Sequence, residues 1–276
     1  MTGCAANKNM LRFEQAHMNG PIRTLVMESP VSIDKGRLQA VFTPDKIKPG
    51  SPESQTLISQ GEQHAREYAL ASMNDALLKQ PMLDIINPSS GQSTITSDIG
   101  EMNFDSPITQ EQADRLRTAT GADALFRFGI SDYGLTPKSW RDGYITFEIT
   151  STLAIAGAIA YTGSAAARAA AGAYLVQEGI EESAESYAGF WALDVVSRPV
   201  RIEAQLVRLN PVTTVWEDSD TGLADVKLSR LTRKVGSAEQ NNQLDQSTDF
   251  AVNGLVSRLS AAMKKIDMPG SGHPIR

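Results

Sequence analysis

The chain has very little cysteine and histidine. Its 276 residues include one cysteine, Cys4, and three histidines, His17, His64 and His273. A single cysteine excludes an internal disulfide framework and any metal site built from several cysteines. Because two of the three histidines lie near the chain ends, neither a Ser-His-Asp triad nor a histidine-rich metal site is predicted.

Other patterns that carry chemistry are also missing. The string "GSAAARAAAG" lacks the Lys-Ser/Thr pair of a phosphate-binding loop, and His64 lacks the His-Glu-x-x-His order of zinc proteases, so we expect a partly exposed helix residue there. Asp123, Asp132 and Asp142 could meet near one end of a strand, but aspartates are common in turns. The sequence therefore predicts no enzyme activity, no catalytic residue, no cofactor and no bound metal.

Charge excludes one class of partner. With 26 basic and 32 acidic residues, the net charge is −6, so the chain is not attracted as a whole to nucleic acid or to an anionic membrane. A hydrophobic content of 41% is enough to bury one substantial core.

The lone cysteine lies in a context that resembles a lipid attachment site. Bacterial lipoprotein signals end in a short apolar motif before a cysteine, and Thr2-Gly3-Cys4 matches the last three positions. No basic and apolar signal precedes Cys4, which favours a trimmed or misassigned start. Ala5 is not the Asp that retains lipoproteins at the inner membrane. We therefore predict that Cys4 is lipidated and anchors the protein to the periplasmic face of the outer membrane, with residues 1–20 as a polar tether.

Hydrophobic periodicity predicts the elements of the first half. Residues 22–30 read as a strand, and 34–59 read as a long loop that contains one short strand, "LQAVFT". Apolar positions that step by four predict an amphipathic helix over 62–79, followed by a short strand in "MLDIINP". Thr109 and Gln112 resemble a capping box that starts the helix "QEQADRLRTAT". Gly121 fits its C-terminal cap.

Alternation with a period of two predicts the strands of the second half. In "ADALFRFGISDYG" and "RPVRIEAQLVRLNP" every second residue is apolar, as expected for strands covered by helices on one side. After Asn210-Pro211, "VTTVWEDSDTG" reads as the hairpin partner, and apolar residues from Val252 to Ile266 predict a last helix. We expect an α/β (α+β) fold in which a small, mostly antiparallel sheet carries helices on one face. It forms a single domain over 21–276, with a tail at about 268–276.

This pattern resembles a known family. The strings "TATGADALFRFGISDYG" and "RIEAQLVRLNPVTTVWEDSDTG", separated by a long insertion, are similar to the core of bacterial periplasmic lipoproteins related to the curli secretion channel CsgG, a fold shared with the N-terminal domain of TolB. The chain departs from that family at Asn210-Pro211, where a Gly is usual. The resemblance implies a small α/β fold and an envelope lipoprotein that works without chemistry of its own.

The insertion, about 144–197, is rich in Ala and Gly, and residues 149–167 carry no charge. In the curli channel the equivalent gap holds a transmembrane β-hairpin, but this composition argues against lipid-facing strands. Three readings stay open: a helical hairpin packed on its own domain, a contact between identical subunits, or a contact with a membrane. Arg168 interrupts the apolar run, so a spanning helix would be weak. The residues predicted to make an oligomer or membrane contact are Leu153, Ile155, Gly157, Ala158, Ile159 and Tyr161.

Three functions are compatible with these features. The first is a non-enzymatic, outer-membrane-associated periplasmic lipoprotein that acts in envelope assembly or export. Its expected partners are the outer membrane, through a lipid anchor, identical subunits and other envelope proteins. Nucleic acid is not an expected partner. The second is a regulatory lipoprotein that activates a periplasmic cell-wall enzyme. Sixteen tether residues span about 50 Å at most, which is short for crossing the periplasm, so the first is favoured. The third is a cytosolic protein with an incidental Cys4.

Overall fold

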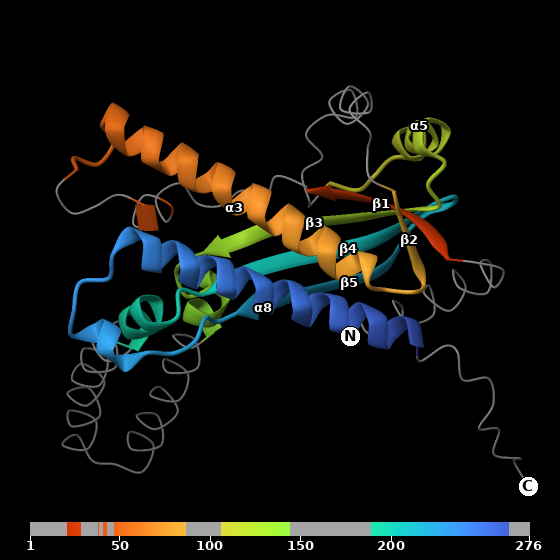
Figure 1. Cartoon of the computed structure of the whole chain (residues 1–276). Coiled ribbons are helices and arrows are strands. Elements are labelled where there is room, and N and C mark those ends of the chain that lie inside the picture. The colour runs from red at the N-terminus through yellow and green to blue at the C-terminus, as the bar shows by residue number, and fades with distance from the viewer. Residues whose placement is uncertain are drawn as a thin grey trace, which may run out of the picture.

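The computed structural model describes residues 21–28, 38, 41–42, 47–86, 106–143 and 189–264. Figure 1 shows the elements, which follow one another along the chain. They are β1 (Ile22–Glu28), α3 (Pro52–Leu78), β2 (Leu83–Ile86), α5 (Gln110–Thr120), β3 (Ala124–Tyr133), β4 (Val200–Leu209), β5 (Val212–Gly222), the 3-10 turn η1 (Leu228–Leu231) and α8 (Ser237–Lys264). This order agrees with the strand, helix, strand, helix, strand, insertion, hairpin and helix predicted from the sequence.

The five strands form one sheet in the order β2-β1-β3-β4-β5. β3 pairs antiparallel with β4, and β4 with β5, as predicted, and these are the two long pairings. β1 lies between β2 and β3 and is parallel to both. The predicted mostly antiparallel α/β sheet is therefore confirmed, and the parallel pairs lie at one side of it.

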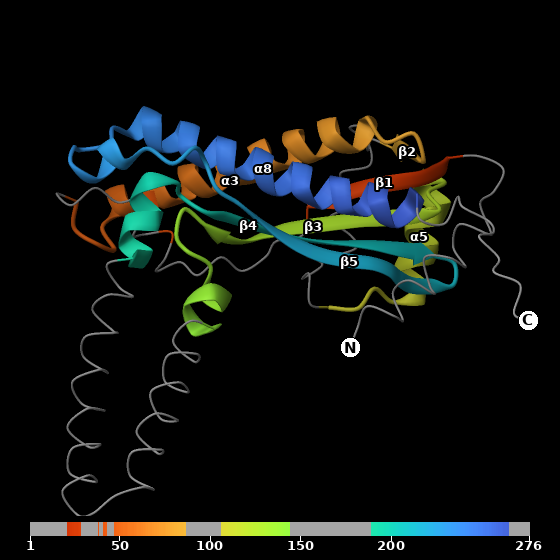
Figure 2. The same ribbon diagram turned by 90° about the horizontal axis from the view of Figure 1, so that it is seen from below.

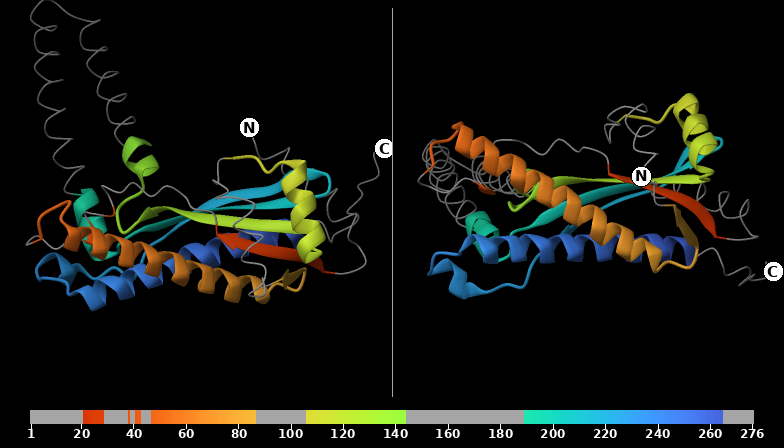
Figure 3. Two further views of the ribbon diagram at one scale, coloured as in Figure 1. Left: turned by 90° about the horizontal axis from the view of Figure 1, so that it is seen from above. Right: turned by 45° about the horizontal axis from the view of Figure 1, so that its top comes forward.

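Two long helices, α3 and α8, lie side by side across one face of the sheet (Figures 2 and 3). The alternation in β3 and β4 decides which side chains they cover, because successive strand residues point to opposite faces. Phe126, Phe128 and Ile202 are buried beneath them, and the rings of Phe126 and Trp216 stack with centroids 6.2 Å apart. This layer is the main core of the protein.

The shorter helix α5 packs on the opposite face of the sheet (Figure 2). Leu116 contacts a second apolar cluster that includes Leu25, Leu125 and Val207, the residues between the core-facing ones. The capping box of Thr109 and the left-handed Gly121 at its end, with φ of 67°, are both present as predicted. Helices therefore cover both faces at this end of the sheet, so the prediction that they lie on one face only is wrong for α5, whose apolar residues match the second apolar face of the strands.

The predicted loop over 34–59 is wrong at its C-terminal end, because α3 begins at Pro52. Ser51 caps the helix by accepting a hydrogen bond from the backbone N of Ser54 at 3.2 Å, and proline is favoured at the first helical position. The predicted strand "LQAVFT" is also wrong at its described residues. Leu38, Val41 and Phe42 are helical, and the first two are buried three positions apart, which is the spacing of one helix face.

The last helix also begins earlier than its apolar stripe predicts. α8 starts at Ser237, and its first half turns polar residues such as Gln243, Ser247 and Thr248 toward the protein interior. Buried polar side chains are stable only when hydrogen-bonded, and these three donate to carbonyl oxygens. Polar residues on the buried face hide the helix from a search for apolar periodicity, which explains the missed start.

Candidate functional site

The residues predicted to carry function lie outside the described residues. These are the lipid attachment site Cys4 and the contact residues of the insertion, Leu153, Ile155, Gly157, Ala158, Ile159 and Tyr161. The structure instead describes the two stretches that flank 144–188. We call residues 134–143 and 189–199 together the insertion base. It lies at the end of the sheet where β3 ends and β4 begins (Figure 2).

Asp194 joins the two halves of the insertion base. Its carboxylate accepts hydrogen bonds from the hydroxyl of Thr136 at 2.6 Å and from the guanidinium of Arg141 at 2.7 Å. The backbone N of Thr136 donates at 2.5 Å to Oδ1, the oxygen that also accepts from the Thr136 hydroxyl, whereas Arg141 donates to Oδ2. The guanidinium of Arg141 also lies 5.4 Å from the ring centre of Phe190. These charge-assisted bonds hold the departing and returning chains together.

Residues 189–196 are helical, and the C-terminal end of this helix is capped by side chains from distant elements. The last carbonyl oxygens of a helix have no partner within it, and a cation there also interacts favourably with the helix dipole. Arg230 in η1 donates to the carbonyl of Val196 at 2.6 Å, and the amide of Gln243 in α8 donates to the carbonyls of Val195 and Val196 at 3.2 Å each. The returning half of the base is therefore tied to both η1 and α8.

Arg230 is itself buried and paired. Its Nε donates to Glu239 at 3.0 Å, and the same carboxylate oxygen accepts from Arg233 at 2.7 Å. Hydrogen bonds from Arg233 first, and then from Arg230, lower the pKa of Glu239 from 4.5 to about 2. This network links the start of α8 to η1.

The chain then enters β4 through a second set of backbone contacts. The carbonyl of Ser197 accepts from the hydroxyl of Ser247 at 2.9 Å and from the backbone N of Ala224 at 3.1 Å. The carbonyl of Pro199 accepts from the backbone N of Gly134 at 2.7 Å. Both neighbours of residue 198 are therefore held in place.

Arg198 lies between these two residues, and both its backbone conformation and its side-chain environment are unusual. Its φ is 46°, in the left-handed region that disfavours side chains with a Cβ. Its Nε is buried without a hydrogen-bond partner, and burial lowers the pKa of its guanidinium. Neither Arg198 nor Asp194 was singled out from the sequence. Their roles depend on contacts between residues far apart in the chain, for which no local motif exists.

Two tryptophans of the insertion base are exposed. Trp140 and Trp191, one on each half, expose 40% and 52% of their surface. Indole combines a large apolar area with one polar group, and tryptophan is enriched at protein interfaces for this reason. The base thus combines a rigid polar interior with exposed aromatic rings.

A second polar cluster joins α3 to α8. The hydroxyls of Tyr68 and Ser72 donate to Asp249 at 3.0 and 2.7 Å, and a ring nitrogen of His64 lies 3.0 Å from Asp245. Desolvation first, and then the bond to Asp249, raise the pKa of Tyr68 to about 12. His64 is partly exposed, as predicted. The cluster sets the relative position of the two helices.

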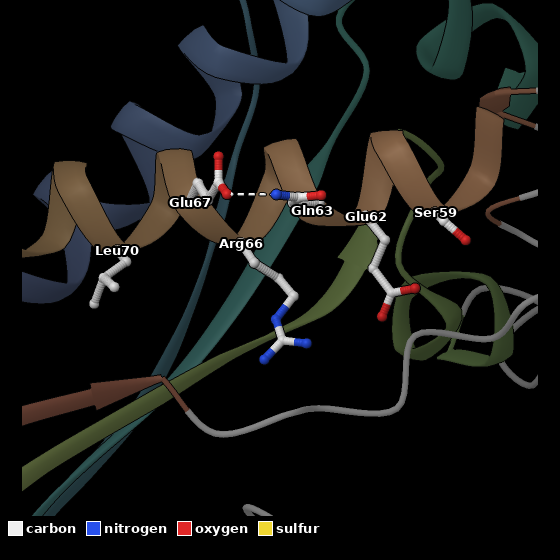
Figure 4. Close-up of a pocket in the computed structure, with 6 residues that line it drawn as sticks. All are labelled: Ser59, Glu62, Gln63, Arg66, Glu67 and Leu70. Carbon is white, nitrogen blue, oxygen red and sulfur yellow. Dashed lines mark hydrogen bonds between the residues drawn. The ribbon is translucent and has the colours of Figure 1, made fainter. Parts of the chain in front are cut away.

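The outer surface of α3 carries a shallow pocket of about 440 Å³. Figure 4 shows that the lining side chains come from this one helix and that Gln63 donates to Glu67, at 2.8 Å. The lining residues are Ser59, Glu62, Gln63, Arg66, Glu67 and Leu70. Among the described residues, no polar group from a second element converges on this pocket in the way that would orient a substrate.

The three aspartates considered from the sequence do not come together. Asp123 precedes β3, whereas Asp132 lies at its far end and Asp142 follows that end, so one member is separated from the others by the length of the strand. Within the described ranges there is no group of three or more His, Cys, Asp or Glu side chains that could hold a metal ion. Among the helices of the same ranges, none is long and apolar enough to cross a membrane.

Comparison with known proteins gives only distant similarities. Neither a protein-family model nor a curated protein sequence matches this chain. Among solved structures, the hypothetical protein CT253 from Chlamydia trachomatis is 9% identical with a TM-score of 0.38, and the match covers 88% of this chain and 98% of that one.

Two further solved structures are similar at the same low level, and one of them is named a lipoprotein. The LpoB C-terminal domain from Salmonella enterica is 9% identical with a TM-score of 0.28, covering 78% of this chain and 96% of that one. Lipoprotein GNA1162 from Neisseria meningitidis is 10% identical with a TM-score of 0.34, covering 87% and 99%. At these values the similarities assign neither a family nor a function to this chain.

Proposed function

We propose that this protein is a non-enzymatic lipoprotein of the bacterial cell envelope that acts in envelope assembly or export by binding identical subunits or other envelope proteins. In this proposal a lipid on Cys4 anchors it to the periplasmic face of the outer membrane. The contact with other subunits is made through the Ala- and Gly-rich segment of the insertion, around Gly157 and Ala158.

The observation that carries the proposal is the construction of the insertion base. Asp194 connects Thr136 and Arg141 on one side of 144–188 to the returning chain on the other, and Arg230 fixes that returning chain to the core. Loops that only connect two strands do not need such support. A base of this kind is expected where the connected segment presents a binding surface, and in this proposal the exposed Trp140 and Trp191 extend that surface.

Assembly through the insertion is tested by a bulky substitution. In Ala158→Leu, the added side chain should prevent close approach of backbones between subunits, so the assembly should dissociate while the thermal stability of the monomer stays nearly unchanged. Sedimentation velocity in mild detergent measures the fractions of assembled and monomeric protein, and thermal unfolding measures the stability of the monomer. Ala261→Leu, at an exposed position of α8, is the matched control and should assemble as wild type. A wild type that is monomeric in every detergent and lipid, together with an unfolded Ala158→Leu, would show that the segment belongs to the core.

Lipid anchoring is tested separately at Cys4. Expressed with its natural upstream region, the protein should gain the mass of a diacylglyceryl group and fractionate with outer membranes, and Cys4→Ser should abolish both. An unmodified, soluble product with a free thiol at Cys4 would disprove the anchor without affecting the test of assembly.

A further inference from the structure

Arg198 carries a charge that is not neutralised within the described part of the chain. Its Nε is buried without a partner, and its guanidinium makes no hydrogen bond or ion pair with the residues that the structure describes. Asp194, whose negative charge acts on Arg198, is already hydrogen-bonded to Arg141 and Thr136. Within the described residues, the guanidinium of Arg198 therefore has no carboxylate bound to it directly.

An unpaired guanidinium in this position lowers stability. Arginine keeps its proton at any physiological pH, so it cannot escape the cost of desolvation by becoming neutral. Burial lowers the pKa of the Arg198 guanidinium, as expected when desolvation disfavours the charged form. The residue nevertheless keeps intermediate exposure, so the side chain is accessible to a ligand from solvent.

The backbone of Arg198 adds a second unfavourable contribution at the same residue. A φ of 46° is strained for any residue with a Cβ, and glycine would adopt it without cost. The flanking bonds from Ser247 to Ser197 and from Gly134 to Pro199 hold this conformation. Strain that the surrounding structure maintains is concentrated at binding and catalytic sites, and at Arg198 it occurs together with a buried Nε that has no hydrogen-bond partner.

We propose that Arg198 is an oxyanion-binding residue whose guanidinium takes the paired oxygens of a carboxylate or phosphate group from a molecule that docks at the insertion base. The planar guanidinium matches both groups with two parallel N–H···O bonds. A free phosphate compound and a carboxylate side chain of a bound protein are the two sources of this chemistry. The inference does not depend on lipid anchoring or on assembly through the insertion.

The test uses the full chain and the variant Arg198→Gly, which suits the left-handed backbone and should therefore fold. Without added anion, the variant should unfold at a higher temperature than wild type, because both the strain and the unpaired charge are removed. Arg233→Ala removes an exposed arginine that is paired with Glu239 and serves as control, with no gain in melting temperature.

Anion binding is then measured with sodium phosphate and sodium acetate against sodium chloride at equal ionic strength. At ten times the dissociation constant, the effective anion should raise the melting temperature of wild type and Arg233→Ala by roughly 2–5 °C and leave Arg198→Gly unchanged. The ¹⁵Nε resonance of Arg198 should shift with the same anion. An effect of phosphate alone indicates a phosphate compound, and an effect of acetate indicates a protein carboxylate.

Three results would overturn the proposal. A lower melting temperature for Arg198→Gly than for wild type would make the residue structural. Equal anion effects on wild type and Arg198→Gly would indicate a general salt effect. An ¹⁵Nε resonance that neither anion shifts would show that Arg198 binds no oxyanion.

Discussion

Arg141 and Asp194 are separated by 53 positions in the sequence, yet the guanidinium of one donates to the carboxylate of the other at 2.7 Å. One residue lies just before 144–188 and the other just after it. The pair therefore closes the insertion at its base, and the side chain of Asp194 is only 12% exposed while that of Arg141 is 31% exposed. Water screens a pair of this kind far less than a surface ion pair.

Replacing Asp194 by Ala should lower the free energy of unfolding by about 2–4 kcal/mol, because Arg141 and the backbone N of Thr136 both lose their partner. Urea denaturation measures the change. Asp75→Ala is the control, since Asp75 makes an exposed pair with Lys79 at 71% exposure and should cost less than about 0.5 kcal/mol. Equal losses in the two variants would show that Asp194 does not support the base.

The same contacts predict how much of the insertion can be deleted without unfolding the protein. A short linker that replaces 144–188 should leave the sheet folded, because β3 and β4 are adjacent antiparallel strands. A linker that replaces 144–197 also removes Asp194 and the carbonyls bound by Arg230 and Gln243, so this variant should be much less stable. Circular dichroism and limited proteolysis compare the two. If the shorter deletion is also unfolded, the insertion itself belongs to the core.

Gly222 should not tolerate a side chain. A Cβ at this position would lie 1.8 Å from the carbonyl oxygen of Ser247 and 2.6 Å from the backbone N of Ala251, and helix backbone cannot move aside cheaply. Gly222→Ala should cost about 3 kcal/mol or more in thermal unfolding. At Gly189 nothing lies within 4 Å of the added atom, so Gly189→Ala should change stability by less than about 0.5 kcal/mol. A tolerated Gly222→Ala would contradict the close packing of α8 on β5.

Acid should weaken the network at η1. The pKa of Glu239 falls from 4.5 to about 2 on folding, so its contribution to stability is fully present above pH 4.5 and is lost as the pH falls toward 2. Glu239→Gln should therefore be less stable than wild type at pH 6, and the gap should narrow on acidification through this window. Melting temperatures of both proteins between pH 6 and 2.5 measure it. A gap that is independent of pH would exclude the ion pairs as its cause.

Much of the fold was predictable because its signals are local. Alternating apolar residues specified β3 and β4, the capping box and Gly121 specified α5, and the turn after Leu209 specified the hairpin with β5. The start of α8 was not predictable, because Gln243 and Ser247 place polar groups on its buried face and satisfy them with distant carbonyls. The roles predicted for Cys4 and for the insertion stay predictions, since these residues lie outside the described ranges.

By itself the sequence determined which segments become strands and helices and which strand faces are apolar, since side-chain periodicity and capping act over a few residues. Only the tertiary structure decided that β1 lies between β2 and β3, that α5 covers the opposite face, and that Asp194 is paired while Arg198 is not. The physical reason is the separation along the chain between the residues that interact. A carboxylate or a guanidinium has the same chemistry wherever it lies, and whether its charge is neutralised depends on residues that folding brings to it from distant parts of the chain.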